Sequence, residues 1–205
     1  MAGDVHAAFA AAAVQDGIAL APRSFDWLGE QGHVGLERVA KARRDPAIGK
    51  PVIAALEDLQ AIYACLRGDV SVLHAGRENL LLAVDLVHAR TGTVVEVDDA
   101  AHFTSFRLAA LDRYRADAPL GFDRDEHRAL CREWAARTDR LGGGLAAKGF
   151  GFGGLPRERA YRDALFDLAT PAMGHPPVVR IAATNSDGAA AYARHRDGLR
   201  RRFAP

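Results

Sequence analysis

Three acidic residues interrupt two strongly apolar segments in the first half of the chain. Asp85 lies in the first segment, and Glu96 and Asp98 lie in the second, where most of their neighbours are valine. A short turn at residues 91–92 separates the two segments, and this pattern is typical of a β-hairpin. Burying a carboxylate without a partner costs several kcal/mol. The hairpin therefore predicts that these acids are either held by positive charge or exposed to water.

The alternation of side chains along a strand places all three carboxylates on one face of the hairpin. A four-residue turn, 89–92, puts Asp85 opposite Glu96, and a two-residue turn puts it opposite Asp98. Either register brings the acids within about 5 Å of one another. Because carboxylates suit hard divalent cations, we predict that Asp85, Glu96 and Asp98 hold one or two Mg²⁺ or Mn²⁺ ions. The alternative is that Asp85 pairs with an arginine while the other two acids face solvent.

His102 follows the second acidic segment by four residues, at an expected turn from strand to helix. From there its imidazole could reach the carboxylate face, as a proton shuttle or as a contact to phosphate. The alternative is a histidine at a helix N-terminus that hydrogen-bonds only to its neighbours. We include it with Asp85, Glu96 and Asp98 in the predicted catalytic set.

The composition is that of an ordinary soluble globular protein. The chain has 205 residues, of which 49% are hydrophobic and 26% charged, and this length suits a single domain with a substantial core. Two cysteines, Cys65 and Cys131, form no disulfide framework, which suits a reducing compartment. No apolar run approaches the length of a membrane span. These features predict a cytoplasmic protein without a membrane partner.

The charge is unevenly distributed along the chain. Residues 1–100 contain 9 Lys or Arg against 14 Asp or Glu, whereas residues 101–205 contain 18 against 12. A basic second half permits binding to a polyanion. However, the chain has 24 arginines and only 3 lysines, so a general compositional bias also explains the basic surface.

Hydrophobic periodicity and chain-breaking residues predict a mixture of helices and strands. The pattern predicts helices over residues 4–15, 35–44, 52–66, 103–114, 124–141, 156–169 and 188–203. Beyond the hairpin, it predicts short strands at residues 70–74 and 178–183 and a proline- and glycine-containing loop over residues 21–35.

The acidic segment also resembles a known motif. Val94-Val95-Glu96-Val97-Asp98, followed by His102 and preceded by Asp85, is similar to the core of the PD-(D/E)XK nuclease superfamily, nearest its very-short-patch-repair-like branch. The resemblance implies a restriction-endonuclease-like α-β-β-β-α-β core within an α/β (α+β) fold. The core would span about residues 52–115 and 177–203. Residues 1–50 would form an N-terminal helical extension, and residues 116–170 a helical insertion.

The resemblance implies a Mg²⁺-dependent endonuclease that hydrolyses phosphodiester bonds. Asp85 matches the first acid of the motif and Glu96 the second. The expected partner is nucleic acid, with DNA as the expected type, and a homodimer is left open. We predict that Arg107, Arg113, Arg115 and Lys148 contact the nucleic acid.

The chain departs from the motif where the superfamily has a lysine, because that position is Asp98. Asp99 stands where the similar branch has glycine, and no proline precedes Asp85. Lys50, Lys148 or His102 could take the place of the missing lysine. The departure also favours an alternative function, a nuclease-fold binding or interaction module without catalysis.

Overall fold

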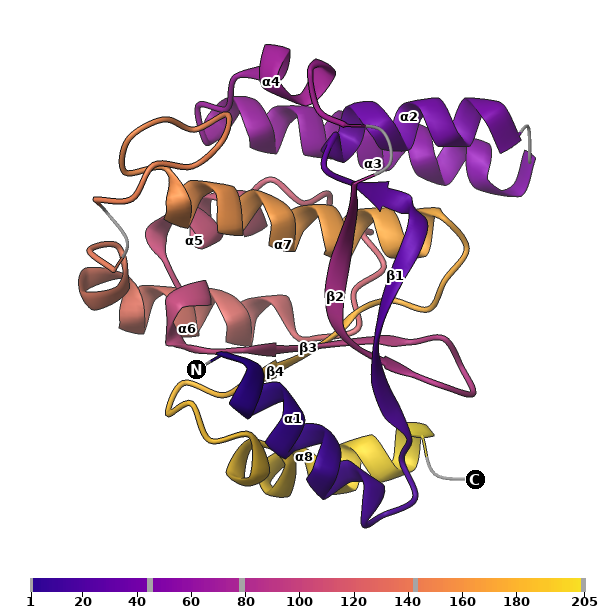
Figure 1. The fold of residues 1–205 in the computed structure, drawn as a ribbon, viewed down its shortest axis with the longest axis vertical. Coiled ribbons are helices and arrows are strands. Elements are labelled where there is room, and N and C mark those ends of the chain that lie inside the picture. Colours follow the sequence, from indigo (N-terminus) through magenta and orange to yellow (C-terminus); the bar gives the residue numbers. More distant parts are fainter. Residues whose placement is uncertain (1, 44–45, 78–79, 142–143, 204–205) are drawn as a thin grey trace.

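A computed structural model gives the structure of the chain and describes residues 2–43, 46–77, 80–141 and 144–203. The described residues form a mixed α/β fold in which helices cover a four-stranded sheet (Figure 1). None of the helices in these segments combines the length and the apolar composition that crossing a membrane requires.

The helices and strands alternate irregularly along the chain. Their bounds are α1 (Ala2–Val14), β1 (Leu20–Gly29), α2 (Gly32–Arg43), α3 (Pro46–Cys65), α4 (Val70–His74), β2 (Leu81–His88), β3 (Val94–Asp98), the 3-10 turn η1 (Ala100–His102), α5 (Ser105–Leu111), α6 (Arg124–Thr138), α7 (Leu155–Ala172), β4 (Val179–Ala182) and α8 (Gly188–Phe203).

The sheet has the strand order β1-β2-β3-β4. The first two pairs are antiparallel, and β3 and β4 are parallel, joined by a connection that contains α5, α6 and α7. Leu86 pairs with Val95 and Val87 with Val94, so Asp85 lies opposite Glu96. This is the register predicted for a four-residue turn. Figure 1 shows β1 and β2 running across the direction of β3 and β4.

Strand β3 is buried on both faces, and its two faces meet different layers. Val95 and Val97 pack in one apolar cluster with side chains of α1 and α8, such as Phe9. Glu96 and Asp98 therefore point to the opposite face, which α7 covers, as expected from alternation along a strand. The larger apolar cluster fills that second layer with side chains of α3, α5 and α7. The acids thus lie at the boundary between the sheet and the main core.

Two predictions of local structure were wrong. Residues 70–74 form helix α4 rather than a strand, because the Asp69 carboxylate accepts a hydrogen bond from the Ser71 amide and caps the helix. Residues 20–29 form strand β1 rather than part of a loop. Pro22 is tolerated there because β1 lies at the edge of the sheet, where a missing amide donor costs little.

The position of β1 changes the division of the chain. Residues 1–50 are not a helical extension, since β1 is the first strand of the sheet and α1 packs on α8. Helices α2, α3 and α4 lie between β1 and β2 in the sequence, and the predicted helical segment 116–170 contains α6 and most of α7.

A glycine sets the close approach of α1 to α8. A Cβ atom on Gly188 would lie 1.9 Å from the carbonyl oxygen of Val5 and 2.8 Å from the amide nitrogen of Phe9, both backbone atoms of α1. Gly198, in the same helix, has no atom closer than the Arg201 Nη2 at 4.0 Å.

We predict that Gly188→Ala lowers the free energy of unfolding by about 1–3 kcal/mol, because α1 must move away from α8. Gly198→Ala is the matched control and leaves stability unchanged or raises it by up to about 1 kcal/mol, because alanine favours a helix. Urea unfolding of both variants checks this. Equal stability of the two variants would contradict the packing described.

Candidate functional site

Asp85 and Glu96 interact across the hairpin through both backbone and side chains. The Asp85 amide donates to Glu96 Oε1 at 3.0 Å, and the Val97 amide donates to Asp85 Oδ2 at 2.9 Å. The regular strand pairing stops just before this point, at Leu86 and Val95. Where β2 and β3 separate, the two carboxylates thus accept hydrogen bonds from backbone amides in place of the backbone carbonyl oxygens of a regular strand pair. Among the described residues, Asp85 Oδ1 and Glu96 Oε2 have no hydrogen-bond partner.

Both carboxyl groups hold their protons more tightly than usual. Burial raises the pKa of Asp85. Burial, and next the neighbouring charge of Asp85, raise the pKa of Glu96 well above its usual value. His6 of α1 offsets part of this, because its Nε2 lies 3.2 Å from Asp85 Oδ2. Two carboxyl groups this close could share a bound cation, which would have to displace the protons that their raised pKa values retain.

The pair opens into a cavity of about 360 Å³ between the sheet and α7, which we call the acidic cavity. Its charged lining residues include Asp85, Glu96, His102, Asp163, Arg159 and Arg162. Carboxylates and guanidinium groups therefore share one hollow. Such a cavity suits an anionic ligand, because the arginines can bind the ligand and the carboxylates can bind a cation that the ligand also contacts.

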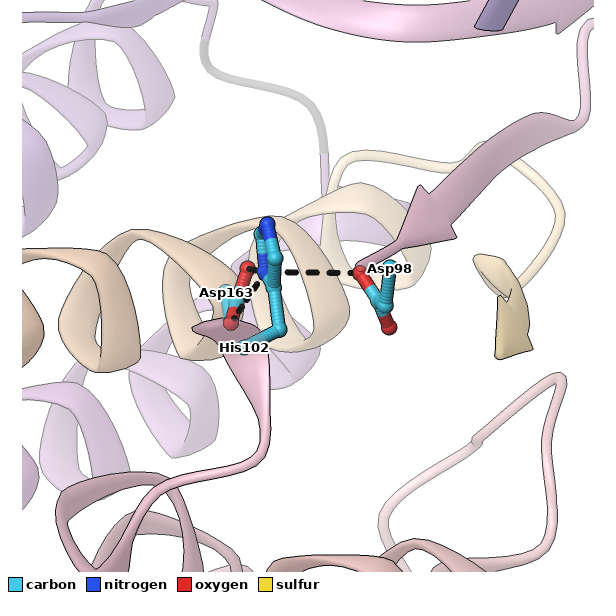
Figure 2. Close-up of side chains that lie close together, drawn as sticks. All are labelled: Asp98, His102 and Asp163. Carbon is cyan, nitrogen blue, oxygen red and sulfur yellow. Dashed lines mark hydrogen bonds and ion pairs between the residues drawn. The ribbon is translucent and has the colours of Figure 1, made fainter. Parts of the chain in front are cut away.

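A second acidic group lies beside the first and includes His102 (Figure 2). The His102 Nδ1 is 3.1 Å from Asp163 Oδ2 and 3.4 Å from Asp98 Oδ1. One ligand atom from each of Asp98, His102 and Asp163 lies within 4.8 Å of the others, so these three residues could hold a metal ion. Figure 2 shows the second ring nitrogen of His102 pointing away from both carboxylates.

The protonation of His102 competes with a metal ion at this second group. Burial lowers the pKa of His102, but Asp163 and Asp98 outweigh it and raise the pKa to about 9. The imidazole is therefore charged at neutral pH and forms ion pairs with both acids. A metal ion that used His102 would first have to displace that proton.

Behind His102 lies a buried network centred on Arg180 of β4. Its guanidinium donates to Asp98 Oδ1 and to Asp167 Oδ1, each at 2.7 Å, and to the Asp163 carbonyl oxygen at 3.1 Å. Arg107 donates to the other oxygen of Asp167 at 2.6 Å. Arg180 holds the pKa of Asp98 well below its usual value and lowers that of Asp163 to about 2, although burial opposes both shifts. Arg180 thus joins strand β3, strand β4 and helix α7 through buried hydrogen bonds.

Both carboxylate oxygens of Asp98 are occupied within the protein. Oδ1 accepts from Arg180 and faces His102, and Oδ2 lies 3.3 Å from His127 Nε2. Asp98 is 1% exposed and does not line the acidic cavity, whereas Glu96 does. The structure therefore brings Asp85, Glu96 and His102 to one cavity and places Asp98 behind it, among basic partners.

The predicted nucleic-acid contacts lie away from this cavity. Arg107 is 1% exposed and engaged by Asp167, so its guanidinium has no surface to offer a phosphate. Arg113 is exposed and donates to the Ala109 carbonyl oxygen, and Arg115 donates to Asp58. Lys148 donates to Glu30 at 3.3 Å. None of the four lines the acidic cavity.

Several residues of the site were not predicted from the sequence. They are His6, Arg159, Arg162, Asp163, Asp167 and Arg180. Two signals could have found part of this set. Asp163 and Asp167 lie four residues apart on one face of a predicted helix, and Arg180 interrupts an apolar strand. A charged residue in a buried strand needs a buried partner.

No family model, no curated protein and no solved structure matches this chain. The geometry of the site is therefore the basis for assigning a function.

We predict that Arg180→Met lowers the free energy of unfolding at pH 7 by about 3–5 kcal/mol, because buried carboxylates lose their common partner. The depressed pKa values of Asp98 and Asp163 contribute stability above the unfolded-state pKa near 4, and this contribution is lost as the pH falls towards their folded-state values. The deficit of the variant should therefore persist from pH 7 to about pH 4 and shrink as the pH falls below 4 in urea unfolding.

Arg196→Met is the matched control for this measurement. Arg196 also binds a carboxylate through two nitrogens, at 2.6 Å each to Asp16, but its side chain is 52% exposed. Water screens an exposed pair, so the control should change stability much less. A pH-independent deficit in Arg180→Met would mean that packing rather than charge explains the loss.

Proposed function

We propose that this protein is a metal-dependent nuclease that hydrolyses phosphodiester bonds of nucleic acid, built on a restriction-endonuclease-like core. The observation that carries the proposal is the pairing of Asp85 and Glu96 on adjacent strands, at a cavity that also contains Arg159 and Arg162. Acids that attract a cation and arginines that attract phosphate together match the needs of phosphodiester hydrolysis.

The order of elements supports the proposed core. Helix α1 is followed by β1, β2 and β3 as two antiparallel pairs, then by helices and by β4 parallel to β3. This is an α-β-β-β-α-β sequence with α2, α3 and α4 inserted after the first strand. The two acids lie on its second and third strands, which are the places the motif assigns to them.

Asp85 and Glu96 fit a hard divalent cation such as Mg²⁺ or Mn²⁺. Each offers one carboxylate oxygen without a hydrogen-bond partner among the described residues, and both have raised pKa values. When bound, such an ion supplies Lewis acidity that activates water and stabilises charge on phosphate oxygens. We assign the ion to this pair rather than to Asp98, whose oxygens already face Arg180 and His127.

Arg159 and Arg162 of α7 bind the phosphate in this proposal. Arg159 donates to the Ala101 carbonyl oxygen at 3.2 Å, which fixes the side chain, and Arg162 has no partner among the described residues. Guanidinium groups match phosphate oxygens in geometry as well as in charge. These two residues replace the sequence-predicted contacts Arg107, Arg113 and Arg115.

His102 provides a proton donor at the same cavity. Asp163 and Asp98 hold its Nδ1, and its pKa of about 9 keeps the ring protonated at neutral pH. Its Nε2–H is then available to donate to the oxygen that leaves the phosphate. Asp163 and Asp98 act here as positioning residues.

A second candidate function is a nuclease-fold binding module without catalysis. The specific observation in its favour is Asp98 at the position of the motif's lysine, with both of its oxygens engaged. Arg180 pairs with Glu96 in the β3–β4 ladder and brings positive charge there. However, a guanidinium does not give up a proton at physiological pH and cannot act as a base.

We predict that 5–10 mM Mg²⁺, roughly the excess that ligand linkage requires for a millimolar site, raises the thermal unfolding temperature of the wild type. Glu96→Gln should abolish this rise, because it removes a charged ligand while retaining the Oε1 acceptor. His102→Asn is the matched control and should keep the rise. The opposite result, with loss only in His102→Asn, would place the ion at Asp98, His102 and Asp163.

The same variant has a second, metal-free readout. The folded-state pKa of Glu96 lies above the unfolded value, so its ionisation destabilises the folded chain as the pH rises. In EDTA, Glu96→Gln should therefore be more stable than the wild type at pH 8, with a smaller difference near pH 5. If the wild type were more stable than the variant at pH 8, this would contradict the inference that ionisation of Glu96 destabilises the folded chain.

We predict that the wild type cleaves labelled oligonucleotides in Mg²⁺ or Mn²⁺ and that Asp85→Asn slows cleavage by roughly 100-fold or more. The asparagine still accepts the hydrogen bond from Val97. Arg162→Gln should slow cleavage by roughly tenfold, the effect of losing one charged hydrogen bond. Arg132→Gln, an exposed arginine of α6, is the charge-matched control and should be unaffected.

Two results would overturn the assignment in different ways. Full activity in purified Asp85→Asn would reject the acidic pair as the catalytic centre. An inactive wild type that still shows the Glu96-dependent response to metal would favour the binding module.

A further inference from the structure

A second cavity adjoins the acidic cavity along helix α7. It has a volume of about 310 Å³ and shares Ala83, Glu158 and Arg162 with the acidic cavity. We call it the apolar cavity, because most of its other lining residues are apolar or aromatic. They include Val72, Leu73, Leu82, Phe150, Tyr161 and Leu165.

The apolar cavity is walled by side chains that are held in place. The Tyr161 hydroxyl accepts a hydrogen bond from the His33 amide at 2.9 Å and lies 2.8 Å from His33 Nδ1. Phe150 and Tyr161 also pack with Tyr63, with ring centroids at 5.1 Å and 4.6 Å from it. These walls are therefore preformed rather than adaptable.

Apolar surface also remains exposed at the rim. Leu80 and Leu81 line the cavity and are 41% and 40% exposed. Exposed apolar surface beside a preformed hollow is typical of a binding site. At the boundary with the acidic cavity, Arg162 and Glu158 supply a cation and an acceptor.

We propose that the apolar cavity binds one unstacked nucleobase of the substrate while Arg162 holds the adjacent phosphate. The proposal rests on the proposed function, because it takes the phosphate to lie in the acidic cavity. A flat heterocycle has the chemistry that this cavity accepts, an apolar face with polar edges. Glu158, whose carboxylate has no partner among the described residues, accepts a hydrogen bond from an amino group of the base.

This placement defines the substrate class. A base buried in a protein cavity cannot also be stacked and paired in a duplex, so the substrate is single-stranded nucleic acid or an unpaired nucleotide within a duplex. The affinity gained from one base against apolar and aromatic walls is roughly tenfold or more.

The test compares the binding of deoxycytidine 5′-monophosphate with that of deoxyribose 5-phosphate, which lacks the base. Neither compound contains a phosphodiester bond, so both can be titrated calorimetrically into the wild type in Mg²⁺ and again in EDTA. We expect the compound with the base to bind roughly tenfold tighter in both conditions. The ratio of the two affinities measures the contribution of the base alone, because any contribution of a metal ion to phosphate binding is common to the two compounds.

Two variants of α4 locate the base. Val72→Trp fills the apolar cavity and should reduce the ratio to about one, with the affinity for deoxyribose 5-phosphate unchanged. Val70→Trp is the matched control, since Val70 lies on the same helix, is 47% exposed and does not line the cavity. It should keep the wild-type ratio.

Equal affinities of the two compounds in the wild type, or no binding of either, would overturn the proposal, and so would an undiminished ratio in folded Val72→Trp. Cleavage activity together with equal affinities would reject the base site while leaving the nuclease assignment intact. A base-dependent ratio in a chain that cleaves nothing would support the base site and reject catalysis.

Discussion

The buried ion network around Arg180 is the interaction on which the rest of the structure depends. It joins β4 to β3 through Asp98 and to α7 through Asp163 and Asp167. The three carboxylates face three cations, namely Arg180, Arg107 and the protonated His102. Removing charges from water is costly unless each finds a partner, and this balance meets that condition. It also commits these three cations to Asp98, Asp163 and Asp167, and leaves the Asp85–Glu96 pair compensated only in part, by His6 and by the nearby charge of Arg180.

The carboxylates of Asp85 and Glu96 become accessible at the point where strands β2 and β3 separate. The strands stay paired as far as Leu86 and Val95, after which side-chain oxygens replace the regular backbone acceptors. Helix α1 supports this point, because His6 contacts both the Asp85 carboxylate and the Val97 carbonyl oxygen. The small residue Gly188 lets α1 lie close enough to α8 to bring His6 there. Packing far from the cavity therefore positions its acids.

Local rules predicted the hairpin well and the rest of the site poorly. Alternation along strands and turn length are properties of neighbouring residues, so the facing of Asp85 and Glu96 could be predicted from the sequence. Strand β1 was missed because its partner β2 lies more than fifty residues later, beyond three helices. The surface role predicted for Arg107 was wrong because its burial depends on Asp167, which comes from a distant helix. The basic partner of Asp98 was not predicted either, because Arg180 comes from β4. The spacing of residues in the sequence cannot distinguish a carboxylate that is free to bind a metal ion from one that is already paired with an arginine.

Asp98 illustrates why this distinction matters for the proposed function. A lysine at its position would offer a proton and a mobile charge, whereas Asp98 instead anchors Arg180 and orients His102. The positive charge near Glu96 is thereby fixed in place and comes from β4 rather than β3. In the proposed nuclease, the donated proton comes from His102, which borders the acidic cavity and carries a proton at neutral pH. Acid–base chemistry in the proposed nuclease would thus belong to the turn that follows β3 rather than to the strand itself.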